Sequence, residues 1–230
     1  MKKFLWKKFS ITNDSRNNPI FFHKNPVERL GFLFYIIYIC PMDEIIKHIQ
    51  KFISLNNDEA EIVLSYFKTE TFKKKQLLLQ ENQTCNKQYF IIKGCVRFYI
   101  NNTKGIEQTL QFGIENWWIT DYLSFQYQTP SHFNIQAIEK LETLSIDRTS
   151  FEELLERFPK LEKYFRLVIQ KSFGASQVRI HYLFTMSAEE RFHHMNNMFP
   201  EFIQRVPQYM LASYLDFSPE FMSKIRAGKV

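Results

Sequence analysis

The stretch that decides the fold is VPQYMLASYLDFSPEFMSKIRAGKV, residues 206–230 at the end of the printed sequence. It contains an apolar segment, a short break and a second, amphipathic segment. Pro207 suits the first turn of a helix that runs through Leu215. Ser218 can act as the N-cap of the next helix, with Pro219 in its first turn. The sequence therefore predicts two short helices joined by a tight turn.

The two predicted helices have apolar sides that can face each other, and the second helix also has a polar side. The apolar sides consist of Met210, Leu211, Tyr214, Leu215, Phe221, Met222 and Ile225. The polar side consists of Ser218, Glu220, Ser223, Lys224 and Arg226. A helix that only closed a core would not need this polar side, whereas a recognition helix in the major groove of DNA would. We therefore predict a helix-turn-helix.

The chemistry of the polar side is that of base and phosphate recognition. Lys and Arg side chains can contact guanine edges or phosphates, and Glu220 can accept a hydrogen bond from a cytosine amino group. We expect Gln208 and Tyr209, at the start of the first helix, to lie near phosphates. The alternative is a plain helical hairpin with a structural role.

The middle of the chain, residues 75–147, has a different pattern of apolar and polar residues. KQYFIIKGCVRFYINN contains two apolar-rich runs around Gly94, KGIEQTLQFG alternates as a half-buried strand does, and HFNIQAIEKLETLSID is a further pair bent near Glu139–Lys140. Short strands at close spacing predict an all-β sandwich or barrel. We expect an amphipathic helical stretch over 43–68 before it. After it we expect a helix over RTSFEELLERFP, capped by Thr149 or Ser150.

A small β-barrel can enclose one ligand, and the loop ENWWITDYLSFQYQTPSHF is the predicted wall of such a pocket. The predicted effector-pocket residues are Trp117, Trp118, Asp121, Tyr122, Ser124, His132 and Phe133. The alternative is that the aromatic side chains fill the barrel and that the loop is simply packed.

The segment PKLEKYFRLVIQKSFGASQVRIHYLFTMSAEERF predicts one long helix with Pro159 in its first turn. A seam at 3–4 spacing runs through Leu161, Phe165, Val168, Ser172, Ala175, Arg179, Tyr182 and Met186. Gly174 costs about 1 kcal/mol against Ala in a helix, and with its small neighbours it would let a second helix approach closely. We predict a dimerisation helix; the alternative is a helix packed on its own domain.

The order of these parts resembles that of the cyclic-AMP receptor protein/fumarate-nitrate regulator (Crp/Fnr) family of bacterial transcription factors, over about residues 42–230. The resemblance implies an α+β fold: a cyclic-nucleotide-binding-like β-roll (a jelly-roll barrel), a long dimerisation helix and a winged-helix-like DNA-binding end. It also implies a homodimer that binds double-stranded DNA through the second helix, with RNA polymerase and an unknown small-molecule effector as further partners.

One departure from the family concerns the effector. Its cyclic-nucleotide-binding members carry a Gly-Glu pair and an Arg-Ser pair around the phosphate, where this chain reads ITDYLSF and PSHFNIQ. Asp121 stands where the Glu would be, and no Arg replaces the phosphate clamp. A cyclic phosphate would lack its bidentate cation partner. We therefore expect no tight cyclic-AMP binding, as in orphan members whose effector is undefined.

A second departure concerns the DNA-reading helix, where better-known members carry Ser-Arg-Glu-x-x-x-Arg. Glu220 and Lys224 match in kind, but Pro219 stands at the position of the first Arg. Asp216 stands where Gly is usual in the turn, and Asp tolerates the left-handed backbone region better than most residues. We expect a DNA site different from that of the cyclic-AMP receptor, and no terminal β-hairpin of the kind found in longer members.

The formal charge of +6 is unevenly placed. Residues 1–41 hold seven Lys/Arg and two Asp/Glu, whereas residues 42–230 hold 23 and 22. The charge is therefore weak support for nucleic-acid binding by the rest of the chain. The apolar run at 30–40 is shorter than the roughly 20 residues of a membrane span and lacks the pattern of a signal peptide. Three interpretations stay open: a packed strand or helix, a membrane-surface anchor, or upstream sequence before a true start at Met42.

Nothing in the sequence argues for catalysis. Cys40, Cys85 and Cys95 match no metal pattern and indicate reduced thiols in a cytoplasmic protein. The strand region offers His132 alone, and the His193–His194 pair cannot face one metal from a helix. No nucleophile–base arrangement or phosphate-binding glycine loop stands out. We expect no enzyme activity, no metal, no cofactor and no membrane partner.

The sequence thus predicts four parts. An extension over 1–41, whose order and native status stay open, precedes a sensor domain over 42–157, a dimerisation helix over 158–186 and a helix-turn-helix domain over 187–230. The expected function is a dimeric, sequence-specific DNA-binding transcriptional regulator. The alternative is a β-roll ligand-binding or protein-interaction module without DNA binding.

Overall fold

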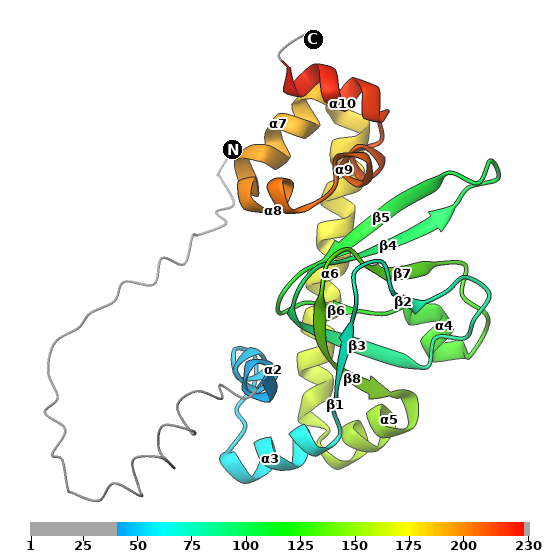
Figure 1. Cartoon of the computed structure of the whole chain (residues 1–230). Coiled ribbons are helices and arrows are strands. Elements are labelled where there is room, and N and C mark those ends of the chain that lie inside the picture. Colours follow the sequence, from blue (N-terminus) through cyan, green and yellow to red (C-terminus); the bar gives the residue numbers. More distant parts are fainter. Residues whose placement is uncertain (1–40, 228–230) are drawn as a thin grey trace, which may run out of the picture. The chain divides into compact units, whose positions relative to one another are not determined.

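Figure 1 shows the computed structural model, which describes residues 41–227. The three interpretations of the N-terminal segment concern residues outside this part, and the domain limits drawn from the sequence stay a prediction. Among the described residues, no helix is both long enough and apolar enough to span a membrane.

Two helices, α2 (Pro41–Gln50) and α3 (Asn57–Ser65), precede the strands. The sequence predicted one helical stretch over 43–68, and the structure breaks it where Asn56 caps α3. The Asn56 side chain accepts a hydrogen bond from the Glu59 amide at 2.8 Å, and the Glu59 carboxylate accepts one from the Asn56 amide at 2.9 Å. This capping box begins a new helix inside a stretch whose apolar pattern alone indicates one.

Eight strands of the described chain form two four-stranded antiparallel sheets, which confirms the all-β prediction. The first sheet has the order β1-β8-β3-β6 and the second the order β2-β7-β4-β5. The strands are β1 (Lys68–Phe72), β2 (Leu77–Leu79), β3 (Lys87–Lys93), β4 (Val96–Asn101), β5 (Glu107–Gly113), β6 (Trp118–Ile119), β7 (Asn134–Ala137) and β8 (Leu141–Asp147).

The two predicted bends are crossings between the sheets. β3 lies in the first sheet and β4 in the second, so the chain changes sheets at Gly94. Gly94 has φ 109°, and a Cβ at this position would lie 2.6 Å from the Lys140 carbonyl oxygen. Only glycine tolerates both conditions. The bend near Glu139–Lys140 likewise takes the chain from β7 in the second sheet to β8 in the first.

Seven helices accompany and follow the strands. They are α4 (Tyr122–Tyr127), α5 (Arg148–Arg157), α6 (Lys160–Thr185), α7 (Ala188–Met198), α8 (Pro200–Arg205), α9 (Gln208–Leu215) and α10 (Pro219–Arg226). The long helix is confirmed as α6. The predicted caps of α5, Thr149 or Ser150, are wrong: Asp147, the last residue of β8, accepts a hydrogen bond from the Ser150 amide at 2.9 Å.

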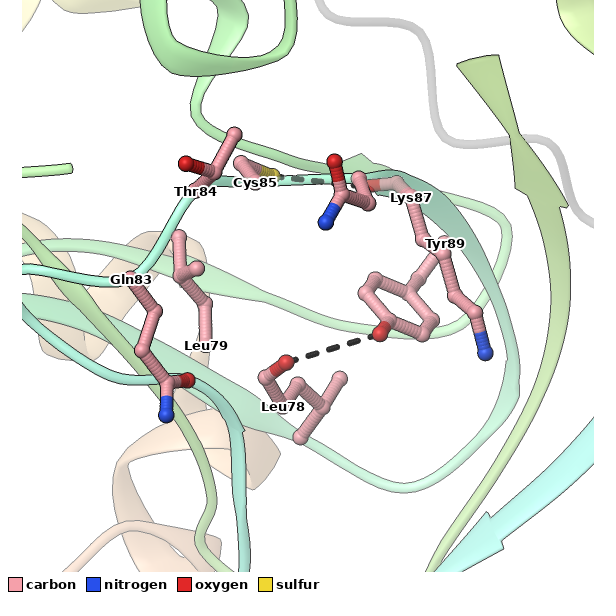
Figure 2. A pocket seen from close by; sticks show the side chains of 8 residues that line it. Leu78, Leu79, Gln83, Thr84, Cys85, Lys87 and Tyr89 are labelled. Carbon is pink, nitrogen blue, oxygen red and sulfur yellow. Dashed lines mark hydrogen bonds between the residues drawn. The ribbon is translucent and has the colours of Figure 1, made fainter. Parts of the chain in front are cut away.

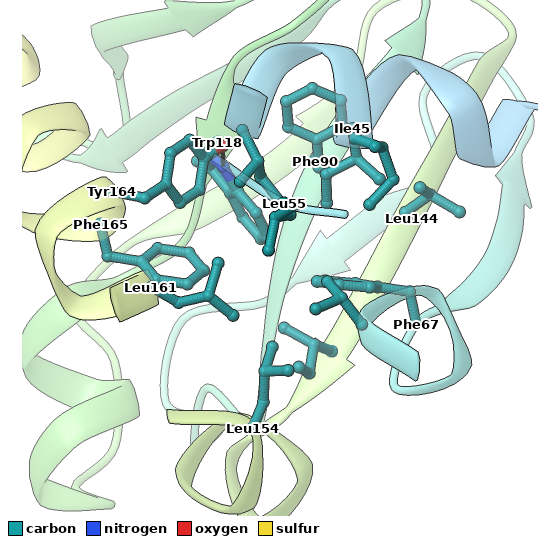
Figure 3. Close-up of a cluster of buried hydrophobic side chains, with 14 residues drawn as sticks. Ile45, Leu55, Phe67, Phe90, Trp118, Leu144, Leu154, Leu161, Tyr164 and Phe165 are labelled. Carbon is teal, nitrogen blue, oxygen red and sulfur yellow. Dashed lines mark hydrogen bonds between the residues drawn. The ribbon is translucent and has the colours of Figure 1, made fainter. Parts of the chain in front are cut away.

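Three apolar clusters alternate with the two sheets. The inter-sheet cluster fills the space between them and includes Phe72, Leu79, Tyr89, Ile91, Val96, Ile119, Phe125, Ile135 and Leu141. The α2-side cluster joins the first sheet to α2, α3, α5 and the start of α6, as Figure 3 shows, and includes Ile45, Ile49, Val63, Phe90, Trp118, Leu144, Leu154, Leu161 and Tyr164. The α9-side cluster joins the second sheet to the C-terminal helices and includes Cys95, Phe112, Ile138, Ile203, Met210, Leu211 and Met222.

A hydrogen-bonded triad lies within the α2-side cluster. The Tyr164 hydroxyl accepts a hydrogen bond from Trp118 Nε1 at 2.8 Å and lies 2.8 Å from His48 Nδ1. The arrangement satisfies every group when Tyr164 donates to an unprotonated Nδ1. Burial, followed by the charges of Lys51 and Lys171, lowers the pKa of His48 to about 4. The neutral imidazole therefore belongs to the folded state.

We expect this triad to make stability depend on pH. An unfolded histidine titrates near pH 6.5, and the folded-state pKa of His48 is about 4. Unfolding thus takes up a proton between these values, so the stability present above pH 6.5 falls as the pH falls to 4. His48→Gln keeps an acceptor for Tyr164 and does not titrate, so its free energy of unfolding should fall less over this range. Urea unfolding at a series of pH values measures this. His132→Gln, at an exposed histidine, should follow the wild-type curve, and a wild-type slope in His48→Gln would contradict the assignment.

Candidate nucleic-acid interface and effector site

α9 and α10 are joined by the tight turn that the sequence predicted. Asp216 adopts left-handed backbone angles, φ 60° and ψ 55°, and the Phe217 amide donates to the Ala212 carbonyl at 3.1 Å. The Ser218 side chain accepts from the Phe221 amide at 3.2 Å, which confirms Ser218 as the N-cap of α10. The N-cap of the second helix thus lies two residues after the left-handed residue that ends the first.

The apolar sides of the two helices are buried. The fully enclosed or nearly enclosed side chains are those of Met210, Leu211, Ala212, Leu215, Met222 and Ile225. Tyr214 and Phe221 are half-buried, and the Phe221 ring lies 5.7 Å from that of Phe217. This packing fixes which side of α10 faces outward.

The outward sides carry the residues predicted to contact DNA. The exposed ones are Gln208, Tyr209, Ser218, Glu220, Ser223 and Lys224; the side chain of Arg226 lies outside the described part. Gln208 and Tyr209 begin α9, whereas the others lie on α10. Both helix starts therefore present polar groups to solvent.

Glu220 gives the outward side of α10 a fixed negative charge. Hydrogen bonding to its own backbone amide, and then to Ser218, lowers the pKa of Glu220. The N-terminus of a helix also favours an anion. A carboxylate here can accept from an exposed base amino group but would be repelled by a phosphate.

The C-terminal helices are not strongly basic. Residues 187–230 contain five Lys/Arg and five Asp/Glu. Arg205 is neutralised by Glu115 and Glu139 of the roll, with Nε 2.8 Å from Glu139 Oε1 and Nη1 3.0 Å from Glu115 Oε2. Nonspecific attraction to phosphates, which depends on the number of free cations, is therefore modest.

α9 lies along β5, the edge strand of the second sheet. The Ser213 hydroxyl accepts a hydrogen bond from the Thr109 amide at 2.7 Å and donates one to the Glu107 carbonyl at 3.1 Å. The Gln108 side chain donates to the Ser213 carbonyl. One serine of the C-terminal helices thus hydrogen-bonds to an amide and a carbonyl on the edge strand.

In the roll, Asp121 is the N-cap of α4 and is only 5% exposed. Its Oδ1 accepts from the amides of Leu123 at 3.1 Å and Ser124 at 3.2 Å, and its Oδ2 accepts from the Ser131 hydroxyl at 2.7 Å. Both carboxylate oxygens are therefore occupied by groups of this chain.

The other predicted pocket residues point to different surroundings. Trp118 belongs to the α2-side cluster, and buried Ser124 accepts from the Cys85 amide at 2.8 Å. Phe133 packs on Phe98, with ring centroids 4.6 Å apart. The predicted pocket residues that are exposed to solvent are Trp117, Tyr122 and His132. The structure does not gather these side chains around one hollow, although the alternative of a simply packed aromatic core accounts for only some of them.

Figure 2 shows a cavity of about 180 Å³ elsewhere in the roll. It is lined by Leu78, Leu79, Gln83, Thr84, Cys85, Asn86, Lys87 and Tyr89. The Tyr89 hydroxyl, which could serve a ligand, donates to the Leu78 carbonyl at 3.4 Å. The cavity is smaller than the roughly 300 Å³ at which small-molecule sites begin. None of its lining residues was predicted, because they come from β2, the turn that follows it and one face of β3, and carry no shared sequence signal.

The roll also contains a buried arginine that the sequence analysis passed over. Arg97 is 3% exposed, and its Nε lies 2.9 Å from Gln136 Oε1 while its Nη2 lies 2.6 Å from Glu107 Oε2. The guanidinium also stacks 4.0 Å above the Tyr99 ring. Neutralised by Glu107, it offers no free charge to a phosphate.

Comparison with known proteins agrees with this architecture. Residues 69–158 match the model of the cyclic nucleotide-binding domain family. No curated protein matches the sequence. Three solved structures share the fold at low identity. The c-di-GMP-responsive global regulator CLP of Xanthomonas campestris has a TM-score of 0.61 at 11% identity, with 73% of this chain and 88% of that chain covered.

FixK2 from Bradyrhizobium japonicum has a TM-score of 0.59 at 14% identity, covering 70% of this chain and 83% of its own. A Eubacterium rectale protein assigned to the Crp/Fnr family has a TM-score of 0.59 at 15% identity, covering 76% and 83%. These likenesses extend past the roll to the C-terminal helices, as the resemblance in the sequence predicted. Residues 69–158 therefore match the cyclic nucleotide-binding domain family, and the described chain shares its fold with solved structures that include a protein assigned to the Crp/Fnr family.

Proposed function

We propose that this chain is a dimeric, sequence-specific DNA-binding transcriptional regulator whose roll does not bind cyclic AMP. The observation that carries the proposal is the α9–α10 pair. Its apolar sides are buried in one cluster, while Glu220, Ser223 and Lys224 stay exposed along one side of α10. A helix of this kind, entered through a capped turn, suits the major groove. Two neighbours of the same fold whose names describe them as regulators, CLP and the Eubacterium rectale protein, support it.

The balance of charges indicates how this regulator would recognise DNA. Residues 187–230 hold as many acidic as basic side chains, so discrimination rests on base contacts by Glu220 and Lys224 more than on phosphate attraction. Salt dependence separates the proposal from its alternative, in which the chain is a roll whose helical end binds a protein. DNA binding weakens with added salt through counterion release, whereas an apolar protein contact does not.

The roll lacks what a cyclic phosphate needs. Asp121 supplies its own carboxylate to the start of α4, where an anionic ligand would otherwise compete for the same amides. Arg97 is paired with Glu107. A phosphate would meet a buried carboxylate and no free guanidinium, which disfavours binding.

α6 supports the dimer through a face other than the predicted seam. Leu161 and Phe165 of that seam are buried within their own chain, and Arg179 donates to the Tyr214 carbonyl. The exposed apolar stripe consists instead of Ile169, Phe173, Ile180 and Phe184. It follows the 3–4 spacing of a helix pair, and a Cβ added at Gly174 beside it would meet nothing within 4 Å.

DNA selection tests the main proposal. From a random duplex pool, the wild type should enrich a two-fold palindrome, and Lys224→Ala/Arg226→Ala should not, because it removes the cations of α10. Lys73→Ala/Lys104→Ala removes two exposed lysines of the roll and should enrich as the wild type does. Absence of enrichment by the wild type, with or without small-molecule extracts, would favour the protein-interaction alternative.

Sedimentation tests the dimer. Phe173→Glu/Phe184→Glu places two charges in the exposed stripe and should turn a dimer into a monomer, because buried unpaired carboxylates are costly. Val178→Glu is the matched control: Val178 is 48% exposed but lies about 140° around the helix from Phe173. Equal sedimentation of all three proteins, as dimers or as monomers, would contradict this use of α6.

Urea unfolding tests the roll. Asp121→Ala leaves two amides and a hydroxyl without their acceptor and should lower the free energy of unfolding by about 2 kcal/mol. Adding about 1 mM cyclic AMP to the wild type should leave its unfolding midpoint unchanged, since only a bound ligand stabilises the folded state. A rise in midpoint with cyclic AMP would show that the roll binds it.

A further inference from the structure

The turn between α9 and α10 is held by two arginines from outside the pair. Arg179 of α6 donates through Nη2 to the Tyr214 carbonyl at 2.7 Å, and its guanidinium stacks 4.4 Å from the Tyr214 ring. Arg191 of α7 donates through Nε to the Leu215 carbonyl at 2.9 Å and through Nη2 to the Asp216 carbonyl at 3.4 Å. The last two carbonyls of α9 and the carbonyl of its C-cap, Asp216, therefore all have guanidinium donors.

Arg191 also binds the end of α6. Its Nη1 lies 2.8 Å from the Met186 carbonyl and 3.5 Å from the Leu183 carbonyl. One half-buried guanidinium thus joins the C-terminal ends of two helices, the long helix and the first helix of the DNA-binding pair.

The physical chemistry of helix ends explains this arrangement. The last carbonyls of a helix lack intrahelical partners and carry partial negative charge. Two such ends placed together repel each other unless a cation lies between them. Only arginine offers several hydrogen-bond donors in a planar fork, whereas a lysine ammonium is a single point charge. Arg191 also sits in the first turn of α7, where a cation is unfavourable to its own helix, so its placement serves the neighbouring helices.

We propose that Arg191 is a positioning residue for DNA reading: by holding the end of α9 against the end of α6, it sets the direction in which α10 presents its outward side. Ser218, the N-cap of α10, lies two residues beyond Asp216, whose carbonyl Arg191 binds. If α6 pairs with a second copy, the same contact sets the separation of the two α10 helices, which must match half-sites about 34 Å apart. This role rests on the proposed function, and Arg179 assists it.

The test compares Arg191→Met, which removes the fork, and Arg191→Lys, which keeps the charge. Arg166→Met is the matched control, because Arg166 is an exposed arginine of α6 for which the structure shows a hydrogen bond only to Gln170, at 3.2 Å. Hydrogen–deuterium exchange of the DNA-free protein compares peptides over 206–227 with peptides over 87–147. Affinities for the selected duplex and for a scrambled duplex are measured alongside. If Arg191→Met does not fold, Arg179→Lys takes its place.

In both Arg191 variants, the amides of α10 should exchange roughly tenfold faster, with the roll unchanged. Arg191→Lys should also lower the ratio of selected to scrambled affinity about tenfold, while its scrambled binding stays near that of the wild type. If the α10 amides of Arg191→Lys exchange at the wild-type rate, the proposal is overturned. It is also overturned if exchange becomes faster over the whole chain, because that marks a general loss of stability. If the wild type selects no duplex, the proposed function fails, and exchange alone decides whether Arg191 positions α10.

Discussion

The constraint on which the rest of this structure depends is that both sheets carry apolar side chains on both of their faces, and these side chains need cover. The inner faces share the inter-sheet cluster, and each outer face needs its own cover. For the first sheet that cover comes from α2, α3, α5 and the start of α6, and for the second from the C-terminal helices. The α9–α10 pair is therefore part of the core of the described chain. Its α9 packs on Phe112 and Ile138 of the roll, which gives strand and helix a common apolar boundary.

The features predicted well from the sequence are those fixed by neighbouring residues. The turn at Asp216, the cap at Ser218 and the sheet crossing at Gly94 each follow from the backbone preferences of one or two residues. The break before α3 and the cap of α5 were missed for a related reason. At each of these places more than one polar residue can serve as a cap, and only the three-dimensional course of the chain selects Asn56 and Asp147.

The features predicted poorly depend on what packs across space. The seam chosen on α6 begins with Leu161 and Phe165, which are buried in their own chain, and an exposed apolar stripe of similar spacing lies elsewhere on the helix. Periodicity alone cannot tell which apolar residues of a helix pack on their own chain. The sequence of β3 likewise does not show which side chains pack on which face. Tyr89 and Ile91 enter one cluster while Phe90 and Ile92 enter another, so the strand appears as one apolar run. The pocket residues were grouped because they are close in sequence, but Trp118 and Asp121 serve a core and a helix cap.

The Ser213 contact with β5 has a consequence for the chain as a whole. A strand at the edge of a sheet exposes amides and carbonyls to which a strand of another molecule can add. Here the Thr109 amide and the Glu107 carbonyl are both hydrogen-bonded to the Ser213 hydroxyl of α9. Any large excursion of the C-terminal helices uncovers this edge together with the apolar surface around Phe112. Docking of the C-terminal helices on this edge therefore also protects the chain against aggregation through strand addition.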